Sequence, residues 1–109
     1  MPTTYKVLGQ SNPSATVAST LYTVPSATQA IVSTITVCNQ AATAGTYRIA
    51  VRVAGAALAA NQYVAYDVSL PANTTDTLTL GVTLAATDVV TVYASSANFS
   101  FAAFGSELS

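Results

Sequence analysis

Apolar and polar residues alternate along several short stretches of the chain. In residues 46–53, Tyr47, Ile49, Val51 and Val53 are separated by polar or small residues, which is the period of a strand with one buried face. Val and Thr dominate these stretches, and both are β-branched residues that favour strands. The pattern predicts about eight strands, at residues 4–8, 19–24, 30–39, 46–53, 63–70, 77–84, 88–95 and 98–104.

The same alternation predicts which side chains face the core. We expect alternating apolar residues to form the buried faces of three strands: Ile31, Ile35 and Val37; Val64, Tyr66, Val68 and Leu70; and Leu78, Leu80, Val82 and Leu84. Clusters of Pro, Gly, Asn, Asp and Ser separate the strands at short intervals, as in β-sandwiches and small barrels. We therefore predict one all-β domain over residues 1–109, an antiparallel β-sandwich that is jelly-roll or immunoglobulin-like. Pro2 and Asn12-Pro13 make residues 1–15 a candidate N-terminal arm.

One strand pairing can be predicted in detail. If residues 46–53 and 63–70 form an antiparallel hairpin, paired residue numbers have a constant sum, and a sum of 115 joins the two apolar faces. That register pairs Ile49 with Tyr66, Val51 with Val64, Arg48 with Asp67 and Arg52 with Tyr63. The last two pairs would be an ion pair and a cation–π contact on the polar face. These four polar-face residues are our candidate interface residues, and Tyr63 is the tyrosine we expect to be exposed.

Charge is scarce. Charged residues make up 6% of the chain and the net charge is −1, against roughly 25% charged residues in an average globular domain. Because interface cores are depleted of charge, we expect much of the surface to contact other proteins. There is no basic stripe for nucleic acid, and no apolar run long enough to span a membrane. The single Cys38 excludes an intrachain disulfide and fits a reducing compartment.

The residues that usually carry catalysis are missing or have simpler explanations. The chain contains no histidine, so an imidazole base and the common zinc sites are excluded. No glycine-rich phosphate loop is present. Asp76 and Asp88 lie where turn chemistry explains them. We therefore expect a protein that is not an enzyme and has neither a cofactor nor a metal.

Four segments, residues 5–10, 21–25, 32–39 and 84–94, resemble small virion structural proteins of tailed bacteriophages, including phages of aquatic bacteria and cyanobacteria. The resemblance covers nearly the whole chain and brings no catalytic residues with it. It implies a β-sandwich located in the virion and assembled in the cytoplasm of the host bacterium. The implied role is a capsid decoration (cement) protein that contacts the major capsid protein, and the alternative is a neck, tail, baseplate or fibre component. The chain would be a homo-oligomer, and as a decoration protein it would form a trimer at capsomer junctions. A carbohydrate-binding module for host adhesion is a second alternative.

Overall fold

The computed structural model describes residues 2–109, and in this part of the chain it is all-β, as predicted. Two short 3-10 helices, Val53–Gly55 and Ala60–Gln62, lie in the connection between β4 and β5. The strands are β1 (Thr3–Ser11), β2 (Ser19–Thr23), β3 (Gln29–Asn39), β4 (Gly45–Arg52), β5 (Tyr63–Leu70), β6 (Thr75–Leu84), β7 (Val89–Ala94) and β8 (Phe99–Leu108).

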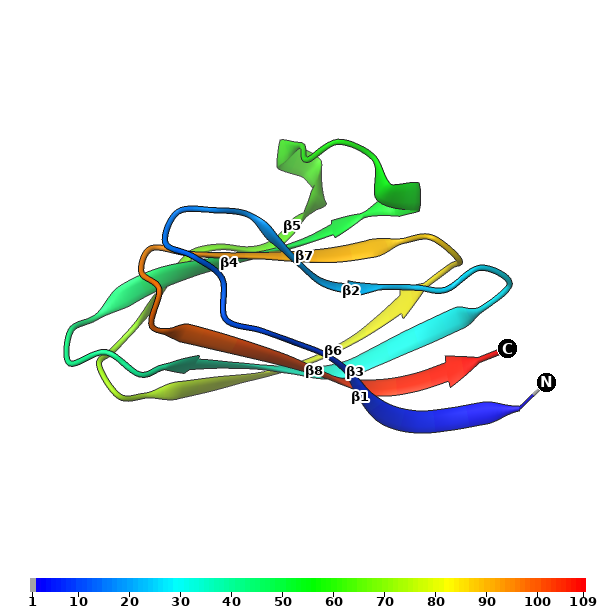
Figure 1. Cartoon of the computed structure of the whole chain (residues 1–109), viewed down its shortest axis with the longest axis horizontal. Coiled ribbons are helices and arrows are strands. Elements are labelled where there is room, and N and C mark those ends of the chain that lie inside the picture. The colour runs from blue at the N-terminus through cyan, green and yellow to red at the C-terminus, as the bar shows by residue number, and fades with distance from the viewer. Residues whose placement is uncertain (1) are drawn as a thin grey trace.

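The strands form two four-stranded antiparallel sheets, which we call sheet I (β1-β8-β3-β6) and sheet II (β2-β7-β4-β5). Figure 1 shows them as two layers. Strand β1 pairs with β8, β2 with β7, β3 with β6 and β4 with β5. This nested set, closed by the β8–β3 and β7–β4 pairs, is the eight-stranded jelly roll rather than the immunoglobulin arrangement.

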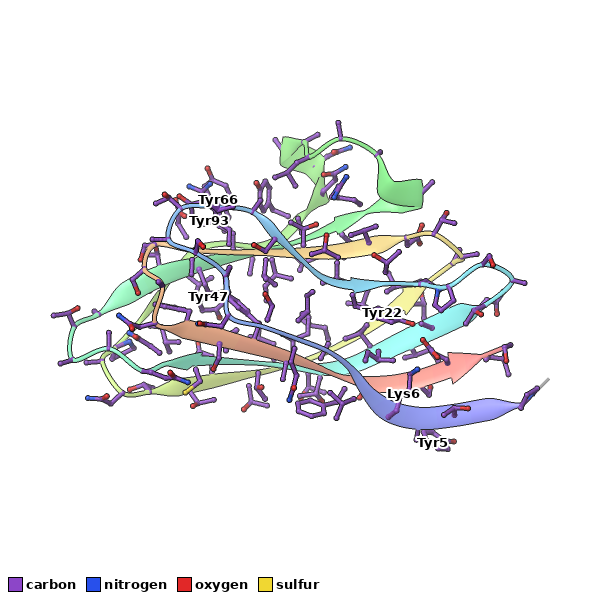
Figure 2. The ribbon with its side chains drawn as sticks, viewed as in Figure 1. Tyr5, Lys6, Tyr22, Tyr47, Tyr66 and Tyr93 are labelled. Carbon is purple, nitrogen blue, oxygen red and sulfur yellow. The ribbon has the colours of Figure 1, made fainter. Side chains whose placement is uncertain are left out.

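The two sheets enclose one hydrophobic core. Val32, Ile35 and Val37 of sheet I and Ile49 and Val92 of sheet II belong to the same buried cluster. The ring of Tyr47, from sheet II, lies between the layers (Figure 2) and packs against Phe99 and Phe101 of sheet I, with ring centroids 6.4 and 6.2 Å away. Tilted and edge-on aromatic contacts of this kind add stability beyond the area they bury.

Bulges reverse some of the predicted orientations. Strand β3 changes register between Val32 and Thr34, so Ile31 points outward and is 47% exposed. The facing bulge in β6 contains Gly81 at φ 62°, and Leu80 is exposed beside it. An extra residue in a strand moves every following side chain to the other face, and alternation alone gives no sign of it.

A third bulge corrects the predicted β4–β5 register. The sum of 115 holds at Tyr47↔Val68 but shifts to Ile49↔Ala65 and Ala50↔Tyr63. The cause lies at Asp67, whose φ of 49° is left-handed, a region that Asp enters more readily than most residues. The predicted pairs of Ile49 with Tyr66, Val51 with Val64 and Arg52 with Tyr63 are therefore wrong, and Val64 and Tyr66 are exposed.

The N-terminal segment lies within sheet I. Strand β1 pairs with β8 from Thr3↔Leu108 to Ser11↔Phe101, and the Ser109 amide donates to the carbonyl of Pro2 at 3.2 Å. Most of the candidate arm at residues 1–15 is thus a paired strand, while Met1 lies outside the described residues. The start of β1 and the end of β8 are therefore close together, as Figure 1 shows.

Candidate interaction surfaces

The predicted ion pair on sheet II is present. Arg48 Nε donates to Asp67 Oδ1 at 2.6 Å and a terminal guanidinium nitrogen donates to Oδ2 at 3.2 Å. The guanidinium also lies between the rings of Tyr66 and Tyr93, with Cζ 4.3 Å from each ring centroid. The hydrogen bond from Arg48 lowers the pKa of the Asp67 carboxyl. Because the Arg48 guanidinium already contacts a carboxylate and two aromatic rings, it is not available to bind another anion.

A shallow groove of about 580 Å³ adjoins this cluster. Leu58, Ala59, Ala60, Tyr63 and Tyr66 line it, and the two tyrosine rings meet edge to face with centroids 4.9 Å apart. Tyr63 is half-buried, whereas Tyr66 is 57% exposed. The prediction of Tyr63 as the exposed tyrosine is therefore wrong.

Arg52 organises the loop that follows β4. Its guanidinium donates to the carbonyls of Gly55 and Ala56 at 3.0 and 2.7 Å. The loop is also held by Asp88, which accepts a hydrogen bond from the Ala54 amide at 2.8 Å. The predicted contact of Arg52 with Tyr63 is replaced by these hydrogen bonds to backbone carbonyls.

Segment 53–62 lies over part of the outer side of sheet II (Figure 1). Ala50 and Thr91 alternate with core residues and so point to the outer side, yet both are buried. The outer side of sheet II is thus partly covered by the chain itself, and it carries Arg48 and Asp67. In the described part of the chain, the outer side of sheet I is neither covered by another segment nor charged.

The outer face of sheet I, which we call the uncharged face, has no charged side chain within residues 2–109. Its apolar members come from three of the four strands: Tyr5 and Val7 of β1, Phe104 of β8 and Ile31 of β3, all exposed. Polar and small residues surround them, including Thr3, Ser33, Thr34, Thr36, Cys38, Thr77, Thr79, Thr83, Ala102 and Ser106. A continuous exposed face of this composition is typical of a protein interaction site.

The charged residues of sheet I turn toward the inner side instead. Lys6 Nζ lies 2.9 Å from Glu107 Oε1, and Figure 2 shows Lys6 and Tyr5 on opposite sides of β1. Tyr22 of sheet II donates its hydroxyl to Glu107 Oε2. In the same way, Tyr47 of sheet II donates to Asp76 Oδ2 at 2.9 Å. Two tyrosine–carboxylate hydrogen bonds therefore join the sheets.

These contacts shift the pKa values of both partners. The hydrogen bond from Tyr22, followed by that from Lys6, lowers the pKa of the Glu107 carboxyl. Burial raises the pKa of the Tyr22 and Tyr47 phenols, and the neighbouring carboxylates add to that rise. At neutral pH the phenols are donors and the Glu107 carboxylate is an acceptor, which is the arrangement that stabilises the link between the sheets.

Sequence reasoning found Arg48 and Asp67 but missed the uncharged face. The pattern in β1 could have indicated it. There the apolar Tyr5 and Val7 point outward and are exposed, whereas the charged Lys6 between them points inward and forms an ion pair. Residues 2–109 contain no cluster of three metal-ligating side chains and no helix able to cross a membrane. Comparisons with protein-family models, curated proteins and solved structures find no match.

Proposed function

We propose that this chain is a non-enzymatic structural protein of a tailed-bacteriophage virion, a capsid decoration protein that stabilises the shell through protein–protein contacts. The observation that supports this best is the uncharged face. A sheet that directs Lys6, Asp76 and Glu107 inward, and Tyr5, Ile31 and Phe104 outward, has the composition of an interface core. No catalytic role is proposed for any residue.

Two further observations agree with a virion role. The segments at residues 5–10, 21–25, 32–39 and 84–94 resemble virion structural proteins. The eight-stranded jelly roll is an architecture shared by viral capsid domains, lectins and cupins. Since a fold hosts many functions, the jelly roll fits the proposal without selecting among these classes. The proposed partner is the major capsid protein, and the proposed location is the virion.

Cryo-electron microscopy of the purified particle tests the proposal, because it gives both the copy number and the location of the subunit. A decoration protein occupies equivalent sites over the whole shell, in hundreds of copies. A few copies on the tail axis would replace decoration with the alternative of a neck, tail, baseplate or fibre component. Absence of the chain from purified particles would contradict both.

The groove on sheet II favours carbohydrate binding as a second candidate function. Tyr66 is exposed and Tyr63 meets its ring at the edge of an apolar hollow, and ligand sites are commonly concave, apolar and aromatic with a few polar groups. A glycan array probed with the wild-type chain and with Tyr66→Ala tests this. Tyr5→Ala, which removes a more exposed tyrosine from the other sheet, is the matched control. Binding that Tyr66→Ala abolishes and Tyr5→Ala retains would support host adhesion, and an array without hits would remove it.

A further inference from the structure

We infer that the uncharged face is covered by the same face of a second copy of this chain, so that two subunits pack sheet I against sheet I about a two-fold axis. This inference rests on the proposed function and deepens it: the uncharged face joins copies of the chain to each other, and the contact with the major capsid protein uses other surfaces of the dimer. The two-fold contact is inferred from the charge, composition, size and accessibility of the uncharged face.

Charge is the first argument. An interface that buries a charge without a partner is strongly destabilised. The outward residues of sheet I offer no charged group to pair with a charged partner, because Lys6, Asp76 and Glu107 already make contacts on the inner side. A second copy brings an equally uncharged surface, so neither subunit has an unpaired charge to bury.

Composition is the second argument. The strand register brings Val7 opposite Phe104, and it places Tyr5, Ser106 and Ile31 in one row across three strands. The apolar residues are thus neighbours rather than scattered singly. Most of the remaining outward residues are Thr and Ser, and a hydroxyl both donates and accepts hydrogen bonds. The hydroxyl groups of one such surface can pair with those of an identical surface. An isologous two-fold interface requires this self-complementarity.

Size and shape are the third argument. A standard interface buries about 20–30 residues on each partner, and the uncharged face spans all four strands of sheet I with roughly that number of outward residues. Two sheets that pack face to face lie about 10 Å apart, with their facing side chains interdigitated. The contact would repeat, between subunits, the packing that sheets I and II make within one.

Accessibility selects this face over the other. The outer side of sheet II is partly covered by segment 53–62 and carries the Arg48–Asp67 ion pair. Nothing in residues 2–109 lies over the outer side of Tyr5 or Ile31, which are 83% and 47% exposed. The open face is therefore the one that a second subunit can reach without rearrangement.

Sedimentation velocity on the full chain, from about 1 μM to about 1 mM, measures the association. The test variant is Ile31→Lys, which places a charge on the uncharged face. The matched control is Val64→Lys, because Val64 is also β-branched, lies within a strand and is 49% exposed, but belongs to sheet II. We expect a wild-type dimer, a dissociation constant raised at least about 100-fold by Ile31→Lys, and a change within about threefold for Val64→Lys.

A second variant and a chemical probe keep the test decisive. Thr79→Lys introduces a charge at an exposed position on the same face and replaces Ile31→Lys if that variant does not fold, as judged by circular dichroism. Cys38 lies on this face and is a free, half-buried thiol. Its rate of maleimide labelling should fall with rising concentration in the wild type and in Val64→Lys, but not in Ile31→Lys.

Three results would overturn the inference: a wild-type chain that stays monomeric up to about 1 mM, dissociation caused equally by Val64→Lys, or a dimer or trimer that Ile31→Lys and Thr79→Lys leave intact. These outcomes are separable from failure of the proposed function. A monomer found on the shell by cryo-electron microscopy refutes the dimer and retains decoration. A solution dimer absent from the particle retains the dimer and refutes decoration.

Discussion

The hydrogen bond from Tyr22 to Glu107 should contribute measurably to stability, and its contribution should depend on pH. Tyr22→Phe removes one hydroxyl from a buried side chain and leaves the ring in place. The Glu107 carboxylate then loses the donor from sheet II and keeps Lys6 at 2.9 Å. The substitution therefore tests a single contact between the sheets and leaves the packing of the ring unchanged.

The expected loss follows from the type of hydrogen bond. A hydrogen bond to a charged group contributes about 1.5–3 kcal/mol, and the retained Lys6 places this case near the lower end, at about 1.5–2 kcal/mol. For a chain of this size 1 kcal/mol corresponds to about 4 °C in melting temperature. Tyr22→Phe should thus melt about 6–8 °C below the wild type at pH 7.

Acid should remove the difference. The Glu107 pKa is lowered in the fold, so the stabilisation is complete above the ordinary glutamate pKa of about 4.3 and is lost as the pH falls through the lowered folded value. Tyr22→Phe raises the pKa of Glu107 in the folded state toward its ordinary value. The difference in free energy of unfolding between the wild type and Tyr22→Phe should therefore become smaller as the pH falls to about 3.

Urea unfolding followed by circular dichroism, at steps between about pH 3 and pH 7, measures this directly. Tyr66→Phe is the control, because Tyr66 is 57% exposed and lies on sheet II, away from the uncharged face, and removal of its hydroxyl should change the free energy of unfolding by less than about 0.5 kcal/mol. A loss at pH 7 no larger than that of the control, or a loss that does not change with pH, would refute the reasoning.

Three other experiments test the fold: two glycine substitutions, unfolding at alkaline pH, and two substitutions of Asp67. Gly105→Ala should cost about 3 kcal/mol or more, or prevent folding, because its Cβ would lie 1.9 Å from a backbone carbonyl of β3. Gly81→Ala, at φ 62° with open space around it, should cost only about 1–2 kcal/mol in urea unfolding. Burial raises the pKa of Tyr22 and Tyr47, so stability should hold up to the ordinary tyrosine pKa of about 10 and fall as the pH rises further. Alkaline unfolding below about pH 9 would contradict this. Asp67→Val should lower the melting temperature more than Asp67→Asn, since a β-branched residue is strained at φ 49°, and equal losses in calorimetry would show that only the ion pair matters.

The strands were predictable because β-branched residues in alternation are a local signal, as in residues 46–53. The bulges were not, since a single extra residue at Ser33 or Asp67 leaves composition and spacing almost unchanged. The Arg48–Asp67 pair was found even though the predicted register fails next to it, because both residues lie where the bulge begins. Contacts such as Tyr22 with Glu107 join residues 85 positions apart, and no local pattern predicts them.

The choice between jelly roll and immunoglobulin-like topology was also beyond local patterns. Both folds have short alternating strands and similar turns, and they differ in which distant strands pair. In this chain the jelly-roll topology is defined by β8, which lies between β1 and β3. Phe99 and Phe101 of β8 complete the core against Tyr47, but nothing in their sequence indicates the neighbours of the strand.

The nested pairing has a consequence for how the chain reaches its native state. Strands β4 and β5 are the only pair joined directly by a loop in residues 2–109, and each further pair encloses the previous one until β1 meets β8. A chain whose contacts join residues so distant in sequence folds slowly. On the ribosome, β1 and β3 have no shared neighbour until β8 has been synthesised, so the edges of sheet I and its apolar residues stay open for most of translation. The incomplete chain is therefore most prone to aggregation before β8 has been synthesised and paired.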